Sequence, residues 1–282
     1  MTTPSSKPYG QLHMVIALPQ EAQPIVKRLS LKRERDCHAF PLYTDHTQNI
    51  FLIVSGKGAL NCVAAINFLA GIHTTATHAA WLNIGIAGHH DESLGTMFFA
   101  TKVINDTDDN SFYPTIRRQQ NISGTTVLSL AKPTLEYPRD VCIDMEAASF
   151  CQSAKRFASA ELIHSLKIVS DNKNQPWTNL DAKCLPALFE QNMPQVETIA
   201  KELLLLSSIE HEQFAPPHFF QELVQTWDFS ETQKHQLRKL LTRRAALKVE
   251  GSPLKDLDTK SLNRNSFLVK LESHLDNIPL EL

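Results

Sequence analysis

The sequence lacks the features of an exported, membrane-spanning or disulfide-stabilised protein. Its first stretch, 1–10, is polar and rich in Pro and Ser, without the basic and apolar regions of a signal peptide. The longest apolar runs, such as Ala79–Ile86, are too short to span a bilayer. The five cysteines are odd in number and form no CxxC pair, which is typical of reduced thiols. We therefore expect a cytoplasmic protein that has no membrane partner.

An excess of one charge sign is also missing. The 28 Lys and Arg residues are matched by 30 Asp and Glu residues, so the formal net charge is -2. Proteins whose surface follows nucleic acid usually carry a strong positive excess. The balance argues against a nucleic-acid partner, although the stretch 231–248 is locally basic. The apolar stripe of that stretch favours docking on its own domain.

Several common catalytic, phosphate-binding and metal-binding motifs are absent as well. The sequence contains neither GxSxG nor HExxH. The loop 55–58 (SGKG) is not a Walker A loop, because Phe51 stands where the first Gly belongs and Gly58 replaces the final Ser or Thr. The run 89–92 (HHDE) contains possible ligands, but adjacent residues on one loop rarely hold a metal in good geometry. We expect no metal site.

Apolar runs and helical patterns alternate through most of the chain. The runs predict strands at 12–18, 50–54, 79–86, 97–104, 125–130, 141–143 and 162–169. The patterns between them predict helices at 20–29, 59–69 and 145–157. Continuous apolar strands that alternate with helices are typical of a parallel sheet covered on both faces. We expect an α/β fold with three layers, αβα, around a central, mostly parallel, twisted sheet.

The pattern changes after the last of these strands. Residues 1–11 are predicted to be a flexible N-terminus, residues 12–208 the α/β domain, and residues 209–282 a helical C-terminal extension. A turn-rich stretch at 214–217 reads as a linker. Ser230 is predicted to cap a helix over 231–248, and a last short helix is expected at 266–275.

Polar residues gather at the predicted strand ends. In open α/β sheets, ligands bind beyond the C-terminal ends of the strands. The polar residues at those ends are Glu21, Ser55, Asn83, Asp144, Glu146, Ser170 and Asp171.

Four segments together match one family. They are 17–21 (ALPQE), 55–58 (SGKG), 83–88 (NIGIAG) and 143–148 (IDMEAA), the last followed by Ser170-Asp171 at the end of a later strand. In this order, over about 12–208, the chain resembles the nucleoside phosphorylase and nucleosidase superfamily. It looks most like the methylthioadenosine/S-adenosylhomocysteine nucleosidase branch.

The resemblance implies hydrolysis of the N-glycosidic bond of a purine nucleoside or a 5′-modified adenosine, without a cofactor. It also implies a homodimer in which neighbouring subunits complete the pocket. Cleavage of this bond builds positive charge on the ribose and negative charge on the departing base. Acids that protonate the base and activate water therefore speed the reaction.

The family roles can be transferred residue by residue. Asp171 matches the general acid at purine N7, Glu21 the acid that activates water, and Glu146 the carboxylate that binds the ribose hydroxyls. Met145 matches the apolar residue against the sugar. The remaining residues expected to bind substrate are Ile86, Gly88, Ser170 and Asp144.

Some residues depart from the family, and alternatives stay open. Ile86 stands where a small or hydroxylated residue is usual, and Lys167 stands where the family has Arg. The segment 106–141 is short, and only Ser129 falls near the expected base-binding position. Each carboxylate taken alone could simply serve a helix start. A phosphorylase that binds phosphate through Lys57, or an impaired nucleoside-binding or scaffold protein, are the alternatives.

Overall fold

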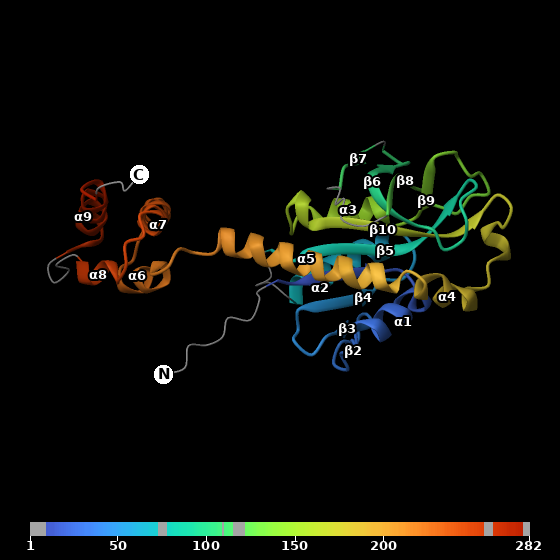
Figure 1. Ribbon diagram of the computed structural model, residues 1–282, viewed down its shortest axis with the longest axis horizontal. Coiled ribbons are helices and arrows are strands. Elements are labelled where there is room, and N and C mark those ends of the chain that lie inside the picture. The colour runs from blue at the N-terminus through green and yellow to red at the C-terminus, as the bar shows by residue number, and fades with distance from the viewer. Residues whose placement is uncertain (1–9, 73–77, 109, 115–121, 257–261, 279–282) are drawn as a thin grey trace. The chain divides into compact units, whose positions relative to one another are not determined.

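The computed structural model describes residues 10–72, 78–108, 110–114, 122–256 and 262–278 (Figure 1). Most of the predicted flexible N-terminus, 1–9, lies outside these residues. The chain divides into two compact units, Met1–Gln213 and Phe214–Leu282. The domain boundary predicted at 208 falls within helix α5, Met193–Phe214.

The first unit contains a large sheet. Within the described residues its strand order is β10-β6-β8-β9-β5-β1-β4-β3-β2, and β7 pairs with β6. The strands are β1 Leu12–Ile16, β2 Lys32–Arg33, β3 Leu42–Thr44, β4 Ile50–Val54, β5 Ala80–His89, β6 Met97–Asn105, β7 Ser111–Phe112, β8 Ser123–Ser129, β9 Val141–Asp144 and β10 Ile163–Asn172. The helices are α1 Pro19–Arg28, α2 Ala59–Ile72, α3 Ala147–Ala154, α4 Leu185–Glu190 and α5, with short 3-10 turns at Ala160–Leu162, Trp177–Asn179 and Ala182–Cys184.

The sheet is mixed, so the prediction of a mostly parallel sheet was wrong. β1 pairs in parallel with β4 and β5, but β6 runs antiparallel to β10 and β9 antiparallel to β5. Because β10 also pairs with β5, the strands β5, β10, β6, β8 and β9 close into a five-stranded barrel. Closure removes strand edges and buries the strands just as a parallel sheet does. Continuous apolar runs therefore report burial without reporting strand direction.

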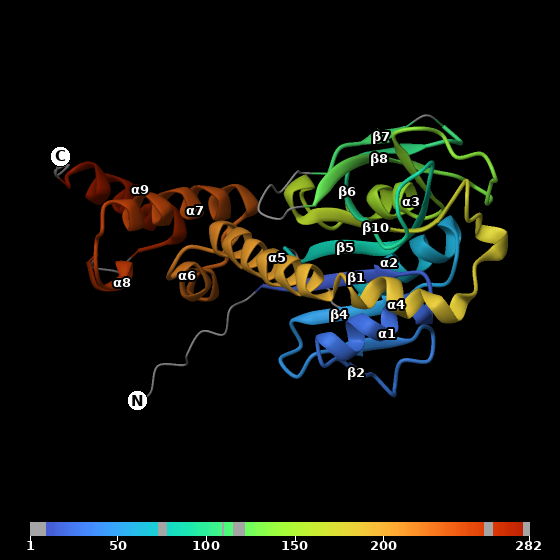
Figure 2. The same cartoon turned by 45° about the vertical axis from the view of Figure 1, so that its right-hand side comes forward.

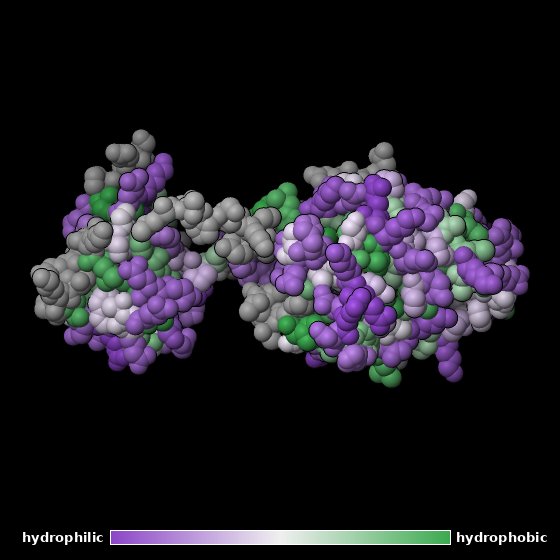
Figure 3. Space-filling view, turned by 90° about the horizontal axis from the view of Figure 1, so that it is seen from below, coloured by the Kyte–Doolittle hydropathy of each residue, from purple (hydrophilic) through white to green (hydrophobic). Residues whose placement is uncertain are grey.

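Helices cover the sheet on two sides and create two cores, which gives the three expected layers. Alternate residues of β1 divide between them: Leu12, Met14 and Ile16 pack in the core with α1, α4 and α5, while Val15 packs in the core with α2 and α3. Figures 1 and 2 show α1, α4 and α5 on the same side of the sheet. Figure 3 shows one face of this unit, on which hydrophilic residues surround smaller hydrophobic areas.

The second unit is helical and has a core of its own. It contains α6 Phe220–Thr226, α7 Glu231–Ala246, α8 Pro253–Asp256 and α9 Arg264–Asp276. Of the predicted apolar stripe of α7, Leu237, Leu240 and Leu241 are buried in this core, as expected for docking within its own domain, whereas Ala245 is exposed. Ser230 caps α7, because its hydroxyl accepts a hydrogen bond from the Gln233 amide at 3.4 Å. None of the helices in the described part of the chain is long and apolar enough to cross a membrane.

Candidate active site

One cavity brings together most of the residues that the sequence singled out; Ser55, Asn83 and Ser129 do not line it. It has a volume of about 490 Å³ and lies where β1, β5, β9 and β10 end. The predicted site residues that line it are Glu21, Ile86, Gly88, Asp144, Met145, Glu146, Ser170 and Asp171. A larger depression of about 750 Å³ beside α1 contains none of the predicted site residues in its lining.

A bulge in β10 presents Asp171 to the cavity. Val169 lies beside Ala87 of β5, yet Asp171 lies beside Gly88, so Ser170 is an extra residue on β10. Such a bulge redirects the side chain that follows it. A Cβ at Gly88 would lie 2.9 Å from Oδ2 of Asp171, so glycine leaves the space that this carboxylate occupies.

Two hydroxyl groups hold the carboxylate of Asp171. The Ser170 hydroxyl donates to Oδ1 at 2.5 Å, and the Tyr137 hydroxyl donates to Oδ2 at 2.8 Å. Asp171 is only 7% exposed, so this carboxylate meets the cavity and little bulk water. Both oxygens keep a second lone pair that a substrate can use.

Glu21 lies in the first turn of α1, directly after β1. Its Oε2 accepts the Leu18 amide at 2.8 Å, and its Oε1 accepts the Ile86 amide at 3.0 Å. Burial raises the pKa of Glu21 to about 7, and the two amide hydrogen bonds only partly oppose that rise. Near neutral pH this carboxylate can therefore both accept and release a proton.

Glu146 occupies the N-cap position of α3 and faces the glycine loop. Its Oε1 accepts the Gly58 amide at 2.6 Å. Burial, followed by the nearby charge of Asp144, raises the pKa of Glu146. The neighbouring Met145 gives the cavity an apolar wall next to this carboxylate. Glu146 therefore offers a hydrogen-bond acceptor to a ligand, and Met145 offers a hydrophobic surface.

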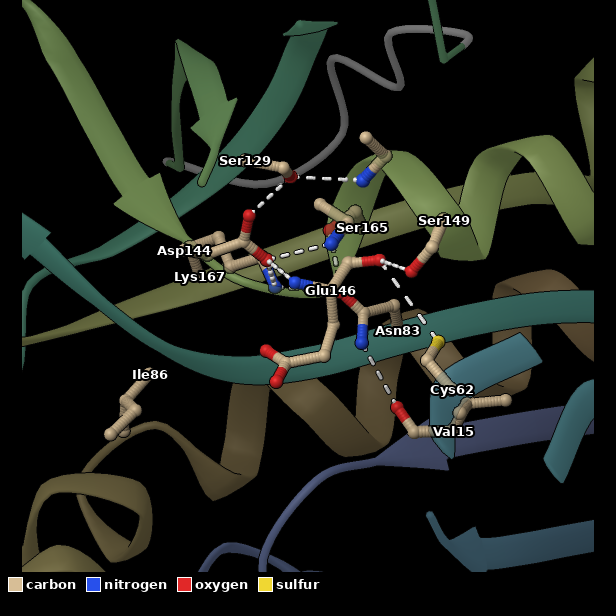
Figure 4. A network of polar contacts seen from close by, with 12 residues as sticks. Val15, Cys62, Asn83, Ile86, Ser129, Asp144, Glu146, Ser149, Ser165 and Lys167 are labelled. Carbon is tan, nitrogen blue, oxygen red and sulfur yellow. Dashed lines mark hydrogen bonds and ion pairs between the residues drawn. The ribbon is translucent and has the colours of Figure 1, made fainter. Parts of the chain in front are cut away.

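A buried ion pair between Lys167 and Asp144 lies next to Glu146 (Figure 4). Lys167 Nζ lies 2.7 Å from Asp144 Oδ2 and donates to Asn83 Oδ1 at 2.7 Å. Burial lowers the pKa of Lys167, but Asp144, Glu146 and Glu21 together outweigh burial and raise it. Lys167 lies beside Gly85 of β5, where a Cβ would be 3.7 Å from its ammonium group.

Asp144 and Ser129 form hydrogen bonds mainly with other groups of the protein. Ser129 lies beside Asp144 in the sheet, and its hydroxyl donates to Asp144 Oδ1 at 2.5 Å. Asp144 Oδ2 accepts the Ala147 amide at 2.8 Å and so holds the start of α3. Asp144 lines the cavity, but each of its oxygens already has a protein partner. Ser129 does not line it, although its position in the sequence suggested a place near the base.

The loop between β8 and β9 supplies residues that the sequence analysis missed. Leu130, Lys132, Pro133 and Thr134 line the cavity, and the buried Tyr137 contacts Asp171. Trp177 joins this loop to the segment after β10, because its indole N–H donates to the Thr134 carbonyl at 2.9 Å. Loop residues carry no periodic pattern that would mark them in a sequence. The only feature that could have pointed to Tyr137 was its aromatic side chain within the short segment 106–141.

The run 89–92 has local partners. His89 stacks on Phe98, with ring centroids 5.7 Å apart, and a ring nitrogen of His90 lies 2.7 Å from the Tyr137 carbonyl. In the described stretches of the chain, no group of three or more His, Cys, Asp or Glu residues is arranged to hold a metal ion.

No family model matches the sequence, and no curated protein matches it. Solved structures do match. A methylthioadenosine/S-adenosylhomocysteine nucleosidase from Helicobacter pylori superposes with a TM-score of 0.56 at 11% identity, over 68% of this chain and 98% of that one. The 5′-methylthioadenosine nucleosidase of Arabidopsis thaliana gives 0.58 at 14% identity, over 70% and 97%. The chain shares the fold of these nucleosidases.

A third solved structure has the same fold and a different name. A futalosine hydrolase mutant from Helicobacter pylori gives a TM-score of 0.53 at 10% identity, over 68% of this chain and 99% of that one. In all three matches the aligned part leaves about a third of this chain uncovered, which is more than the 69 residues of the second unit.

Proposed function

We propose that the chain hydrolyses the N-glycosidic bond of a purine nucleoside or a 5′-modified adenosine. The observation that carries the proposal is the meeting of Glu21, Glu146 and Asp171, from three distant segments, in one cavity. The three carboxyl groups differ in their hydrogen-bond partners. Glu21 accepts two backbone amides, Glu146 accepts an amide of the glycine loop, and Asp171 accepts two side-chain hydroxyls. Different settings allow different roles.

The proposed reaction uses each carboxyl group once. The bond between C1′ and the base nitrogen breaks, and its electron pair leaves with the base. Asp171 gives its proton to N7 of the departing purine. Water adds to C1′ and its proton passes to Glu21, while Glu146 binds the ribose hydroxyls. The products are the free base and a ribose, and positive charge that builds on the ribose is stabilised by the surrounding carboxylates.

The charge of the cavity favours water over phosphate as the nucleophile. Four carboxylates line the cavity, and the buried ammonium group of Lys167 already binds Asp144 and Asn83. A phosphate dianion beside Glu21 would meet like charge in a poorly solvated place. Lys57 and Lys132 also line the cavity, but both side chains are exposed. They could bind an anionic group on the substrate, so nucleotides belong in the substrate panel.

The test is base release from a panel of nucleosides and 5′-modified adenosines, with and without phosphate. We expect free ribose as the product, no need for phosphate, and a loss of about 100-fold or more in Asp171→Asn and Glu21→Gln. Glu190→Gln, which changes an exposed glutamate at the end of α4, serves as the matched control. Ribose 1-phosphate as the product would establish a phosphorylase instead. Tight nucleoside binding without any release would indicate a binding module.

The same proposal includes a homodimer. Helix α2 contains no charged residue, and its outer face exposes Leu60 (87%) and Ile72 (48%). The helix follows the glycine loop whose Gly58 amide binds Glu146, so a partner on this face would lie beside the cavity. Sedimentation should show a dimer that Leu60→Glu dissociates, while Val269→Glu, at an exposed apolar position of α9, leaves it intact. A monomeric parent protein would refute this part of the proposal.

We also propose a cytoplasmic location. All five cysteines are free thiols, and burial raises the pKa of Cys62, Cys142 and Cys151 to about 12, which keeps them unreactive. Fractionation of cells that express the tagged chain would test the location, and recovery outside the cytosolic fraction would contradict it.

A further inference from the structure

We propose that Tyr137 is a positioning residue that holds the acid Asp171 in place and favours release of its proton to the departing base. The inference rests on the proposed function and extends it to a loop residue that has no place in the mechanism above. Tyr137 lies between β8 and β9, remote in sequence from Asp171, and is only 8% exposed.

Its neighbours determine the direction of the hydrogen bond between the two side chains. The backbone amide of Trp177 lies 3.2 Å from the Tyr137 oxygen and can only donate to it. The single hydroxyl hydrogen of Tyr137 is therefore available for Asp171 Oδ2, at 2.8 Å. Burial raises the pKa of Tyr137 to about 12, so this group keeps its hydrogen at neutral pH.

The aromatic ring is also held in a defined position. A Cβ at Gly88 would lie 2.8 Å from Cε1 of Tyr137, so the ring packs directly on the bare backbone of β5. The backbone carbonyl of Tyr137 lies 2.7 Å from a ring nitrogen of His90. Contacts at the ring, the hydroxyl and the backbone leave the hydroxyl little freedom to turn away from Asp171.

A donor in this position acts more strongly on the product of proton transfer than on the starting state. When Asp171 gives its proton to the base, negative charge develops on its two oxygens. Hydrogen bonds to a carboxylate are stronger than hydrogen bonds to a neutral carboxyl group. The hydroxyls of Tyr137 and Ser170 therefore stabilise Asp171 as the proton leaves, and Tyr137 itself keeps its own proton throughout.

The chemistry of the leaving group separates this role from a purely structural one. A purine needs a proton to leave, whereas 4-nitrophenolate leaves without one. We expect Tyr137→Phe, which keeps the ring and removes only the hydroxyl, to lower kcat on a purine nucleoside by about 10- to 100-fold with little change in KM. On 4-nitrophenyl riboside the variant should stay within about twofold of the parent protein, as Asp171→Asn should.

The experiment measures both substrates with the full chain, Tyr137→Phe, Asp171→Asn and the double variant. The proposal predicts that Tyr137→Phe causes no further loss once Asp171 has become Asn, because the hydroxyl acts only through that acid. Equal losses on both substrates would indicate a structural role and overturn the proposal, as would an unchanged rate on the purine substrate. If the parent protein cleaves neither substrate, the proposed function fails, and the role of Tyr137 fails with it.

Discussion

The surroundings of Glu21 determine how the activation of water depends on pH. Burial raises the pKa of this carboxyl group from 4.5 to about 7. On 4-nitrophenyl riboside, whose leaving group needs no proton from Asp171, kcat/KM should therefore fall about tenfold for each pH unit below about 7 and reach a plateau above it, because Glu21 must be ionised to activate water. An ordinary glutamate would be ionised throughout this range and would leave the rate flat between about pH 5.5 and 8.

The same rise in the pKa of Glu21 also makes the free energy of unfolding depend on pH. Because the folded-state pKa lies above the unfolded value, Glu21 contributes most stability below about pH 4.5, and that contribution falls as the pH rises through about 7. The difference between the two values corresponds to about 3 kcal/mol. Glu21→Gln carries no titrating group, so the difference in unfolding free energy between parent and variant should change by about that amount between these limits.

Two assays check this reasoning. Release of 4-nitrophenolate, measured at low substrate concentration over the pH range, gives kcat/KM, which reports ionisation in the free enzyme. Urea unfolding of the parent protein and Glu21→Gln at several pH values gives the stability difference. A rate that does not change from about pH 5.5 to 8, together with a stability difference that is independent of pH, would refute the assignment of Glu21 as a buried base.

Three further predictions concern the support of the site and the second unit. Lys167→Met should lower the unfolding free energy by about 3 to 5 kcal/mol in urea, because it leaves buried Asp144 without its cation, and adding Asp144→Asn should restore part of the loss. Gly88→Ala should slow base release by about 10- to 100-fold by displacing Tyr137 and Asp171. The isolated fragment 214–282 should unfold cooperatively by far-UV circular dichroism because it has its own core; a gradual, non-cooperative loss of signal would contradict that.

Much of the first unit could be predicted because its local signals are strong. The predicted strands at 50–54 and 97–104 correspond closely to β4 and β6, since continuous apolar runs bounded by polar loops are hard to mistake. The helices α1, α2 and α3 were also predicted, with ends that differ by a few residues. The 22-residue helix α5 was missed, although Met193, Val196, Ala200 and Leu203 are buried at helical spacing, so the signal was present in the sequence.

The residues of the candidate site also divide into those that the sequence predicted and those that it did not. Glu21, Glu146 and Asp171 could be selected from the sequence because each follows a strand end, and strand ends of neighbouring strands meet at one edge. By contrast, the hydrogen bond from Tyr137 to Asp171 joins a loop to a strand 34 residues away, and nothing periodic marks either partner. The buried pair of Lys167 and Asp144 likewise depends on how β10 and β9 are placed.

The sequence by itself determined where strands and helices form, because burial and periodicity are local properties of the chain. It also determined which acids could act, since their chemical type is independent of the fold. Only the tertiary structure decided the direction of the strands, the closure of five of them into a barrel, and the partners of each carboxyl group. Those features depend on contacts between distant segments, and so does the pKa of Glu21, which burial raises to about 7.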